Sequence, residues 1–485
     1  MNILYIDVDS LRPDHLGCYG YFRNTSPNID KIAERGVRFT NYYASDTPCA
    51  PSRTALFTSQ FGIHNGVVNH GGTNADIRPI GKNRPFNYHH TDYQGWVDKL
   101  RFKNFHTAII SPFAGRHAAW HILEGFLEVH DTGKHAGETA DDVSKVAVRW
   151  IKERGTEKQN WFLYVNFWDP HTPYRTPEEF GNPFKDDPAP EWLTEEIIAK
   201  HRESYGPMSA RDLPKGDQWP GLPDEIRNRD DFKRWIDGYD TAIRYVDEHI
   251  GILLNTLEEE GLLDETIIII SADHGENQGE LNIYGDHQTA DHITARIPFI
   301  IAGPGIIKGH VDEDFHYQID CGPTLAELVG ASPSKKWDGV SFLPAITKGE
   351  SVGRPYLVLS QQAWSCQRSV RFDNWILIRT YHDGLKELPD LMLFDVENDP
   401  HETENLVDQY PEVVAKGLRL LDEWVTEQMK KSDSPIDPMW QVIQEGGPFH
   451  TRGDFTVESY IQKLKNTGRK EAAKRLAKRY GIEIS

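Results

Sequence analysis

The chain has little cysteine and no long apolar segment, and each absence excludes a class of protein. Only four cysteines occur among 485 residues, and no two of them are spaced as a C-x-x-C pair. A disulfide-rich scaffold and a zinc knuckle are therefore excluded. No apolar run approaches the length of a membrane span, so we expect no membrane partner. The four cysteines are Cys18, Cys49, Cys321 and Cys366.

The start of the chain also lacks the pattern of a secretory leader. Met1 is followed at once by an apolar run over residues 2–6 that is typical of a strand, with no basic segment before it. We therefore expect the protein to reside in the cytoplasm. An exported form whose leader had been removed would show the same sequence.

Positive charge is scarce. The chain carries 53 Lys and Arg residues against 74 Asp and Glu residues, which gives a formal net charge of -21. Such an acidic protein is not expected to bind nucleic acid or an anionic membrane surface. An anionic substrate would need a cation and a few basic side chains gathered in one place.

What the sequence does contain is an alternation of short apolar runs and helical patterns. Apolar runs with few polar interruptions are typical of strands covered on both faces. The segments 138–154 and 231–260 are expected to be helical, and Ser26 with Pro27 predicts a helix that ends at Gly36. We therefore expect a doubly wound α/β domain that binds ligands at the carboxyl ends of its strands. The expected strands are 3–8, 107–110, 161–167, 266–271, 298–302 and 356–359.

Changes in composition divide the chain into regions, because 485 residues are too many for one compact core. Residues 1–365 hold the α/β pattern and form the expected larger domain. Within them, the proline-rich stretch 172–225 is predicted to be a structureless lid or insertion. Residues 366–485 are expected to form a smaller α+β domain. It should contain an antiparallel sheet, a helix over 407–429 and a basic helical tail with a solvated face.

Acidic and histidine residues follow two of the expected strands. Asp7 and Asp9 lie at the end of the first strand, and Asp273 and His274 follow the strand at 266–271. Buried carboxylates are costly unless they are paired or bind a cation, and strand ends meet at the ligand-binding edge of an open sheet. Oxygen ligands with one imidazole suit Ca²⁺, Mg²⁺ or Mn²⁺. There are two alternatives to a metal site. Asp273 could lie in a simple turn, and Asp7 could be a buried acid that is hydrogen-bonded to a neighbouring strand.

The run Cys49-Ala50-Pro51-Ser52-Arg53 is the most specific motif in the chain. It resembles the C-x-P-S-R signature of type I sulfatases, whose cysteine is oxidised to formylglycine by a formylglycine-generating enzyme. From the residues alone, a cysteine in a turn before a helix also fits, because Pro51 suits a first helical turn. The resemblance extends over nearly the whole chain. It implies an alkaline-phosphatase-like fold in which a large mixed sheet is flanked by helices and the larger domain is catalytic.

The resemblance also implies one bound metal ion, which is calcium in most sulfatases. This sequence departs from many family members, which have two adjacent acids where Asp9 is followed by Ser10. Asp7 lies on the same strand face, so its carboxylate could replace the missing one. A hydroxyl ligand from Ser10, or no replacement, is the alternative. The expected metal ligands are Asp7, Asp9, the modified Cys49, Asp273 and His274.

The chemistry of sulfate ester cleavage explains the need for an aldehyde. A hydrated formylglycine carries two hydroxyl groups on one carbon. One attacks sulfur and displaces the alcohol, and the other then expels sulfate as the aldehyde re-forms. A serine would stop at a stable sulfate ester. The metal ion lowers the pKa of the attacking hydroxyl and neutralises charge on the sulfuryl oxygens.

Basic residues near the strand ends are candidates for proton transfer and sulfate binding. Arg53 resembles the partner of the formylglycine and the metal shell, and His171 resembles the histidine that contacts the sulfate or the leaving oxygen. Many relatives have a sulfate-binding lysine where this chain has His287, so the resemblance implies that His287 binds the sulfate in its place. His117 falls near a Gly-Lys-x-His run of relatives and is a candidate catalytic group, although a surface histidine also fits there. The remaining substrate-binding candidates are Arg116 and His70.

The sequence therefore predicts a sulfatase that acts on a small-molecule or oligosaccharide sulfate ester, with a carbohydrate sulfate preferred. A phosphonate monoester or phosphodiester hydrolase shares the fold and the motifs and is the main alternative. A protein that binds sulfated glycans without the cysteine modification is a second alternative. Aromatic residues in 172–225 could stack on sugar rings. A homo-oligomer is compatible with the sequence.

Overall fold

The computed structural model describes residues 1–70, 95–135, 137–216, 221–448 and 456–483. Its large sheet has eight strands in the order β11-β2-β10-β7-β1-β6-β4-β5. β10 runs antiparallel to both of its neighbours, and the other pairs are parallel. The expected mixed sheet is confirmed. Its strands are β1 (Asn2–Val8), β2 (Gly36–Tyr43), β4 (His106–Ile110), β5 (Glu128–His130), β6 (Trp161–Phe167), β7 (Thr266–Ser271), β10 (Phe299–Ala302) and β11 (His310–Tyr317).

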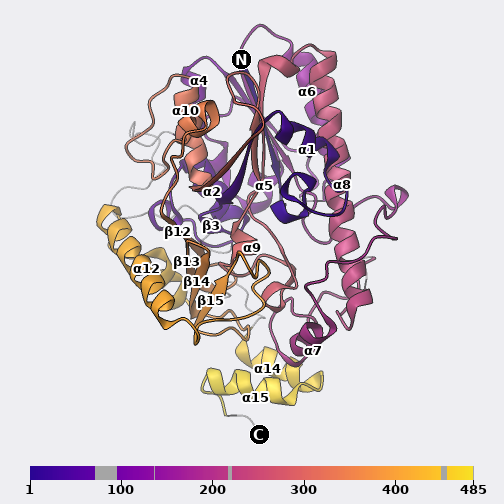
Figure 1. The fold of residues 1–485 in the computed structure, drawn as a ribbon, viewed down its shortest axis with the longest axis vertical. Coiled ribbons are helices and arrows are strands. Elements are labelled where there is room, and N and C mark those ends of the chain that lie inside the picture. Colours follow the sequence, from indigo (N-terminus) through magenta and orange to yellow (C-terminus); the bar gives the residue numbers. More distant parts are fainter. Residues whose placement is uncertain (71–94, 136, 217–220, 449–455, 484–485) are drawn as a thin grey trace.

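The central strands β1, β6 and β7 are buried along their whole length. Every residue in them is buried, as expected for apolar strands covered by helices on both faces. In Figure 1, α1, α6 and α8 lie on one side of the sheet and α2, α4 and α10 on the other. None of the described helices is long and apolar enough to cross a membrane. The six flanking helices are α1 (Pro27–Glu34), α2 (Cys49–Thr58), α4 (Trp96–Phe102), α6 (Ala140–Trp150), α8 (Arg229–Glu259) and α10 (Cys321–Leu328).

A second, smaller sheet has five strands in the order β15-β14-β13-β12-β3. β12 to β15 are antiparallel, whereas β3 joins β12 in parallel. Helix α12 (Pro411–Lys431) packs against this sheet and shares its apolar cluster. The expected antiparallel sheet is thus confirmed. Its strands are β3 (Asp46–Thr47), β12 (Tyr356–Gln361), β13 (Cys366–Phe372), β14 (Trp375–His382) and β15 (Leu391–Asp395).

Two local expectations are wrong, and two strands were not expected. The run at 356–359, expected with the large sheet, belongs to β12 in the small one, because a short apolar run looks the same in either sheet. β2 and β11 have no counterpart among the expected strands, since polar residues interrupt both. The Ser26 hydroxyl does not cap α1. It accepts from the Gly17 N–H and donates to Asp30, both at 2.9 Å.

The proline-rich stretch and the C-terminal tail also differ from expectation. The stretch is not structureless, because it contains a 3-10 turn (Glu178–Phe180) and α7 (Glu195–Glu203). The tail forms two helices, α14 (Val457–Asn466) and α15 (Lys470–Arg479), which lie close to α7 (Figure 1). Several of its basic residues make ion pairs, among them Lys463 and Arg469, which both pair with Asp212. The charged face of the tail is therefore only partly solvated.

Candidate active site

Four potential metal-ligating side chains converge at the carboxyl ends of β1 and β7. Asp9 follows β1, Asp273 and His274 follow β7, and Cys49 is the first residue of α2. One ligand atom from each lies within 4.8 Å of the others, and Cys49 Sγ is 3.0 Å from His274 Nε2. All four residues are buried, with at most 3% of their surface exposed. The structure therefore brings together four of the five expected metal ligands.

Strand register and hydrogen bonds hold these loops in place. β1 and β7 pair with Asp7 opposite Ser271, so both segments leave the sheet at the same level. Ser10 turns the first loop with a φ of 61°, and its N–H donates to Asp273 Oδ1 at 3.2 Å. From α2, the Ser52 hydroxyl donates to the Asp273 carbonyl at 2.6 Å. The serine of the signature motif thus ties α2 to the loop after β7.

Arg53 is the cation that the acidic residues share. Its guanidinium donates to Oδ2 of Asp7 at 2.8 Å, of Asp9 at 3.0 Å and of Asp273 at 2.6 Å. The ring of Phe113 covers the guanidinium, with its centroid 4.5 Å from Cζ. One positive charge therefore meets three carboxylates, and full ionisation would leave two negative charges without a counterpart. A divalent cation would supply that charge, so the residues present fit a metal ion.

Asp7 has different surroundings from the other two acids. Its Oδ2 also accepts from Asn166 Nδ2 at 3.1 Å, and it lies outside the converging group of ligands. Burial raises the pKa of Asp7 and of Asp273, whereas at Asp9 the effect of burial is outweighed by Arg53, which lowers the pKa. Asp7 is therefore a buried acid that is hydrogen-bonded to the neighbouring strand. Its assignment as a metal ligand stays a prediction.

Burial also sets the protonation of Cys49 and His274. It raises the pKa of the Cys49 thiol well above the usual value, and Asp9 and Asp273 add to this effect. An unmodified Cys49 would therefore be a thiol rather than a nucleophilic thiolate at neutral pH. Burial lowers the pKa of His274 to about 4. Its Nδ1–H donates to the Gly275 carbonyl at 2.8 Å, so Nε2 carries the lone pair that a metal ion needs.

Two further histidines stand beside Cys49. His171 follows β6 and His287 follows β9 (Tyr284–Asp286), and each offers a ring nitrogen within 4.8 Å of the sulfur. The Nδ1–H of His171 donates to the Thr172 carbonyl at 2.7 Å, which directs its Nε2 to other partners. The ring centroid of His287 is 4.0 Å from that of His274. Burial lowers the pKa of His287 well below its usual value.

The other predicted residues lie farther out along a wall of aromatic rings. His117, at the end of α5 (Phe113–His117), has its ring centroid 5.0 Å from His70 and 6.4 Å from Trp168. Burial lowers the pKa of His117 to about 3. Arg116 is exposed, and its guanidinium lies 5.3 Å from the centroid of Trp168. The contact between Trp168 and His171, with ring centroids 5.3 Å apart, joins this wall to the residues beside Cys49.

Some polar residues around the ligands are absent from the sequence predictions. Asn166 on β6 contacts Asp7. Gln318 Oε1 lies 2.9 Å from the Ser52 hydroxyl oxygen, and Gln318 Nε2 donates to the Ala272 carbonyl at 3.1 Å. A polar residue near the end of an apolar strand is a signal that could have marked Asn166. No comparable signal marks Gln318, which reaches the site from 266 residues beyond Ser52.

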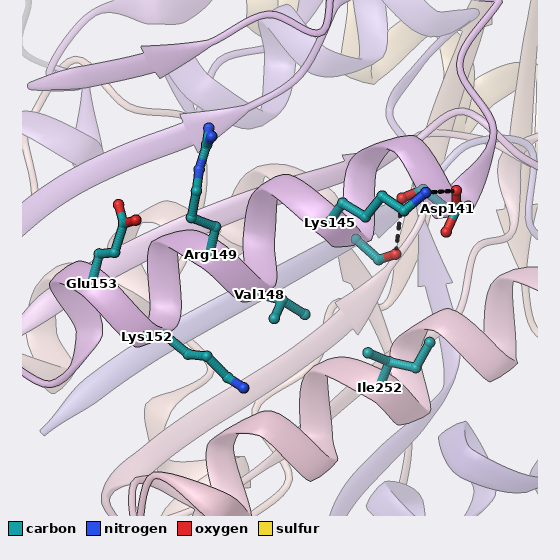
Figure 2. Close-up of a pocket in the computed structure, with 8 residues that line it drawn as sticks. Asp141, Lys145, Val148, Arg149, Lys152, Glu153 and Ile252 are labelled. Atoms are coloured by element: carbon teal, nitrogen blue, oxygen red, sulfur yellow. Dashed lines mark hydrogen bonds and ion pairs between the residues drawn. The ribbon is translucent and has the colours of Figure 1, made fainter.

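A surface hollow between α6 and α8 contains different chemistry (Figure 2). Val148 and Ile252 supply its apolar lining, and charged side chains surround them. The Lys145–Asp141 pair, 2.5 Å apart, joins successive turns of α6 and is largely exposed. Ion pairs of this kind are common on helix surfaces. The candidate active site is therefore the group of residues at the strand ends.

Two family models match the chain. The model described as Sulfatase matches residues 1–331. The model described as N-sulphoglucosamine sulphohydrolase, C-terminal, matches residues 279–428. The first spans more than half of the chain and includes all four converging ligands.

Known proteins of similar sequence and structure agree with these matches. Choline-sulfatase of Rhizobium meliloti is 27% identical over 452 residues, which cover 84% of this chain and 82% of the relative. N-acetylglucosamine-6-O-sulfatase of Bacteroides thetaiotaomicron is 24% identical, with coverage of 90% and 87%.

Solved structures share the fold. One, in complex with its substrate D-glucosamine-2-N,6-O-disulfate, has a TM-score of 0.71 at 22% identity and covers 89% of this chain and 98% of its own. Phosphonate monoester hydrolase from Silicibacter pomeroyi has a TM-score of 0.68 at 22% identity, with coverage of 89% and 96%.

Proposed function

The chain belongs to the sulfatase family, and we propose that it removes sulfate from a carbohydrate ester by means of a formylglycine formed from Cys49 and one divalent cation. Family membership makes it a sulfuric ester hydrolase of the alkaline phosphatase superfamily. The observation that carries the mechanistic proposal is the convergence of Asp9, Cys49, Asp273 and His274 into one buried group.

The proposed cation would be held by the carboxylates of Asp9 and Asp273, by His274 Nε2 and by the oxidised side chain of residue 49. The unbalanced negative charge around Arg53 supports this assignment. A divalent ion supplies Lewis acidity, which lowers the pKa of the attacking hydroxyl and withdraws charge from the sulfuryl oxygens. Because oxygen ligands predominate, we propose Ca²⁺.

The chain's own residues would orient the ester and manage its protons. Arg53, one helical turn after Cys49 on α2, holds the carboxylates of the site together. His171 would hold a proton at Nε2 for the leaving alcohol oxygen, since its Nδ1–H already donates to a backbone carbonyl. His287 would contact the sulfate from the side of β9.

A carbohydrate substrate is supported by the relatives and by the aromatic wall. One relative is named N-acetylglucosamine-6-O-sulfatase, and one similar structure contains a sulfated glucosamine. Another relative, choline-sulfatase, is named for an alcohol that is not a sugar. His117 is stacked between Phe113 and His70, with centroid distances of 4.4 and 5.0 Å, so a sugar ring would pack on the half-buried ring of His70 at the end of this stack.

Peptide mass spectrometry combined with a substrate panel tests the proposal. The protein would be produced together with a formylglycine-generating enzyme, and the Cys49 peptide examined for the aldehyde. The panel would contain sulfated monosaccharides, glycosaminoglycan disaccharides, 4-nitrophenyl sulfate and an aryl phosphonate monoester. We expect multiple turnovers on a sugar sulfate only when the aldehyde and a divalent ion are present. Full activity with unmodified Cys49, or a preference for the phosphonate, would contradict the proposal.

A further inference from the structure

Gln288 presents a buried hydrogen-bond acceptor that has no donor among the described residues. Only 2% of the residue is exposed. Its Nε2 donates to Asp286 Oδ2 at 2.6 Å, and this contact fixes which end of the amide is oxygen, because a carboxylate accepts and does not donate. Its Oε1 is left without a partner in the described part of the chain. Buried polar atoms in proteins are normally satisfied, so this oxygen indicates a missing donor.

This amide lies beside the proposed sulfate site. The carboxylate of Asp286 that holds Gln288 is also 3.6 Å from His287 Nε2, and the His287 N–H donates to it at 2.8 Å. The His287 ring in turn packs against His274, one of the converging ligands. Gln288 is therefore separated from the catalytic groups by a single carboxylate.

Another buried polar atom without a partner lies on the same side. Glu276 is fully buried, and its Oε2 has no hydrogen-bond partner in the described ranges. Burial raises the pKa of Glu276, and the negative charges of Asp286 and Asp9 add to this effect. No Lys or Arg among the described residues forms an ion pair with Glu276 or Asp286. Among the described residues, this side of the site therefore has no cationic donor bound to its carboxyl groups, in contrast to the Arg53 side.

A loop of the small sheet closes the same region. Gln361 Nε2 donates to the His287 carbonyl and Ser365 Oγ donates to the Gln288 carbonyl, both at 2.8 Å. Between them, Gln362 is 1% exposed and its Oε1 also lacks a partner in the part of the chain described. The loop after β12 thus fixes the backbone that carries Gln288 and adds a second acceptor.

Aromatic rings connect this loop to the nucleophile position without a break. The ring centroid of Trp364 is 6.4 Å from that of His70, and His70 is followed by His117, Trp168 and His171 along the wall. Neighbouring centroids in that series are 5.0, 6.4 and 5.3 Å apart. His171 then lies 5.8 Å from His287. Ring faces together with acceptor oxygens suit a sugar, which has C–H faces and hydroxyl donors.

We propose that Gln288, oriented by Asp286, and the loop at residues 361–365 form the subsite for the leaving group. The subsite takes a sugar ring with a hydroxyl close to the sulfated carbon, and that hydroxyl donates to Gln288 Oε1. This inference rests on the proposed function and specifies which residues recognise the sugar. A site built to bind a hydroxyl discriminates strongly against substrates that lack it, because its buried acceptor is then left unpaired.

The test compares two substrates with the formylglycine-bearing enzyme. The first is whichever glucose, galactose or glucosamine monosulfate the wild type hydrolyses fastest, and the second is 4-nitrophenyl sulfate, which has no hydroxyl donor. We expect Gln288→Leu to lower the ratio of kcat/KM for the sugar to kcat/KM for the aryl sulfate by about tenfold or more. Gln428→Leu, which removes a buried amide from α12, should leave this ratio within about twofold.

Deoxy analogues give a second comparison. The wild type should hydrolyse the matching deoxysugar sulfate about tenfold more slowly than the parent sugar, and Gln288→Leu should no longer distinguish the two. If Gln288→Leu does not fold, Asp286→Asn replaces it, because losing the carboxylate frees the Gln288 amide and should lower the same ratio. Choline sulfate, which carries a cation and no hydroxyl, serves as a further probe.

Three outcomes would overturn the inference. Gln288→Leu could slow the sugar and the aryl sulfate equally, which would indicate a general role in the fold. The wild type could prefer choline sulfate, which would mean that the acceptors bind a cation. It could also hydrolyse 4-nitrophenyl sulfate but no sugar sulfate. Failure on every sulfate ester, with the aldehyde confirmed, would instead contradict the proposed function.

Discussion

At the scale of single residues, the site depends on a charge balance around Arg53. One guanidinium binds Asp7, Asp9 and Asp273 in a buried region, where electrostatic interactions are stronger than in water. The three carboxylates nevertheless face different partners. Asp9 and Asp273 point to the group that includes Cys49, whereas Asp7 contacts a side chain of β6. We therefore expect the three to differ in their importance for the metal ion.

Substituting these acids one at a time tests that difference. Asp9→Asn should lose the metal ion and with it the activity. Asp7→Asn should retain one ion per chain while activity falls about 10–100-fold. This range is typical of residues that orient the metal-binding side chains without contacting the metal. Metal content measured by inductively coupled plasma mass spectrometry on dialysed protein separates the two. Loss of the ion from both variants would show that Asp7 is itself a ligand.

The second prediction at this scale concerns the nucleophile. Cys49→Ser should complete at most one turnover, because a serine oxygen can take the sulfo group but has no second hydroxyl to expel it. Intact-protein mass spectrometry after mixing with substrate should detect one added sulfo group. Cys18→Ser, a half-buried cysteine outside the converging ligands, should keep multiple turnovers. Sustained turnover by Cys49→Ser would show that the mechanism is wrong.

The site residues that could be predicted are each marked by a local signal in the sequence. Asp9 and Asp273 follow apolar strands, and Cys49 lies in a specific motif, so each can be found locally. Asn166 and Gln288 could not be assigned a function in this way. Their significance comes from contacts that the sheet register and loop packing create, with Asp7 in one case and with Asp286 in the other.

At the scale of elements, the C-terminal helices hold a segment that supports the active site. Arg469 binds both carboxylate oxygens of Asp212, at 2.6 and 2.8 Å, and the Tyr460 hydroxyl donates to the same carboxylate at 2.8 Å. Four residues before Asp212, the Met208 carbonyl accepts from the Tyr284 N–H at 2.9 Å. β9 carries that tyrosine and leads directly to the proposed sulfate-binding histidine. The tail thus stabilises β9 through one buried acid.

Asp212→Asn should destabilise the protein markedly. Burial opposes ionisation of Asp212, yet Arg469 and Lys463 lower its pKa to about 2, and removing one member of a buried pair typically costs about 3–5 kcal/mol. Glu387→Gln is the matched control, since its ion pair with Arg475 is partly exposed and should contribute at most about 1 kcal/mol. Urea denaturation measures both. Equal effects would contradict a special role for Asp212.

Helix α7 carries a histidine, His201, whose titration should make the free energy of unfolding depend on pH. Burial lowers the pKa of His201 to about 4, and its Nδ1 lies 2.8 Å from the Tyr284 hydroxyl. The folded chain then binds fewer protons than the unfolded chain, whose histidine titrates near 6.5, so stability is lost as the pH falls from about 6.5 toward 4.

The predicted loss of stability at low pH can be measured with one substitution. Acidification from about pH 7 to pH 5 should lower the free energy of unfolding of the wild type by roughly 1–2 kcal/mol more than that of His201→Gln. Calorimetric melting curves at the two pH values give the comparison. An equal loss in both proteins would mean that His201 is not buried in its neutral form.

At the scale of the whole molecule, the central strands were the easiest feature to predict. β1, β6 and β7 are apolar along their length, and burial on both faces requires that composition. The small sheet was harder, because β12 has the same apolar pattern and only its pairing with β13 and β3 distinguishes it. That pairing matters for function, since β12 brings the loop at residues 361–365 from the small sheet to the active site.

The most direct test of the account is a crystal structure of the formylglycine-bearing enzyme grown with a divalent metal, in which anomalous scattering identifies the ion. We predict one ion coordinated by Asp9, Asp273 and His274 together with the oxidised side chain of residue 49. An ion bound elsewhere, or a fully active enzyme in which these side chains lie too far apart to share one, would contradict the account.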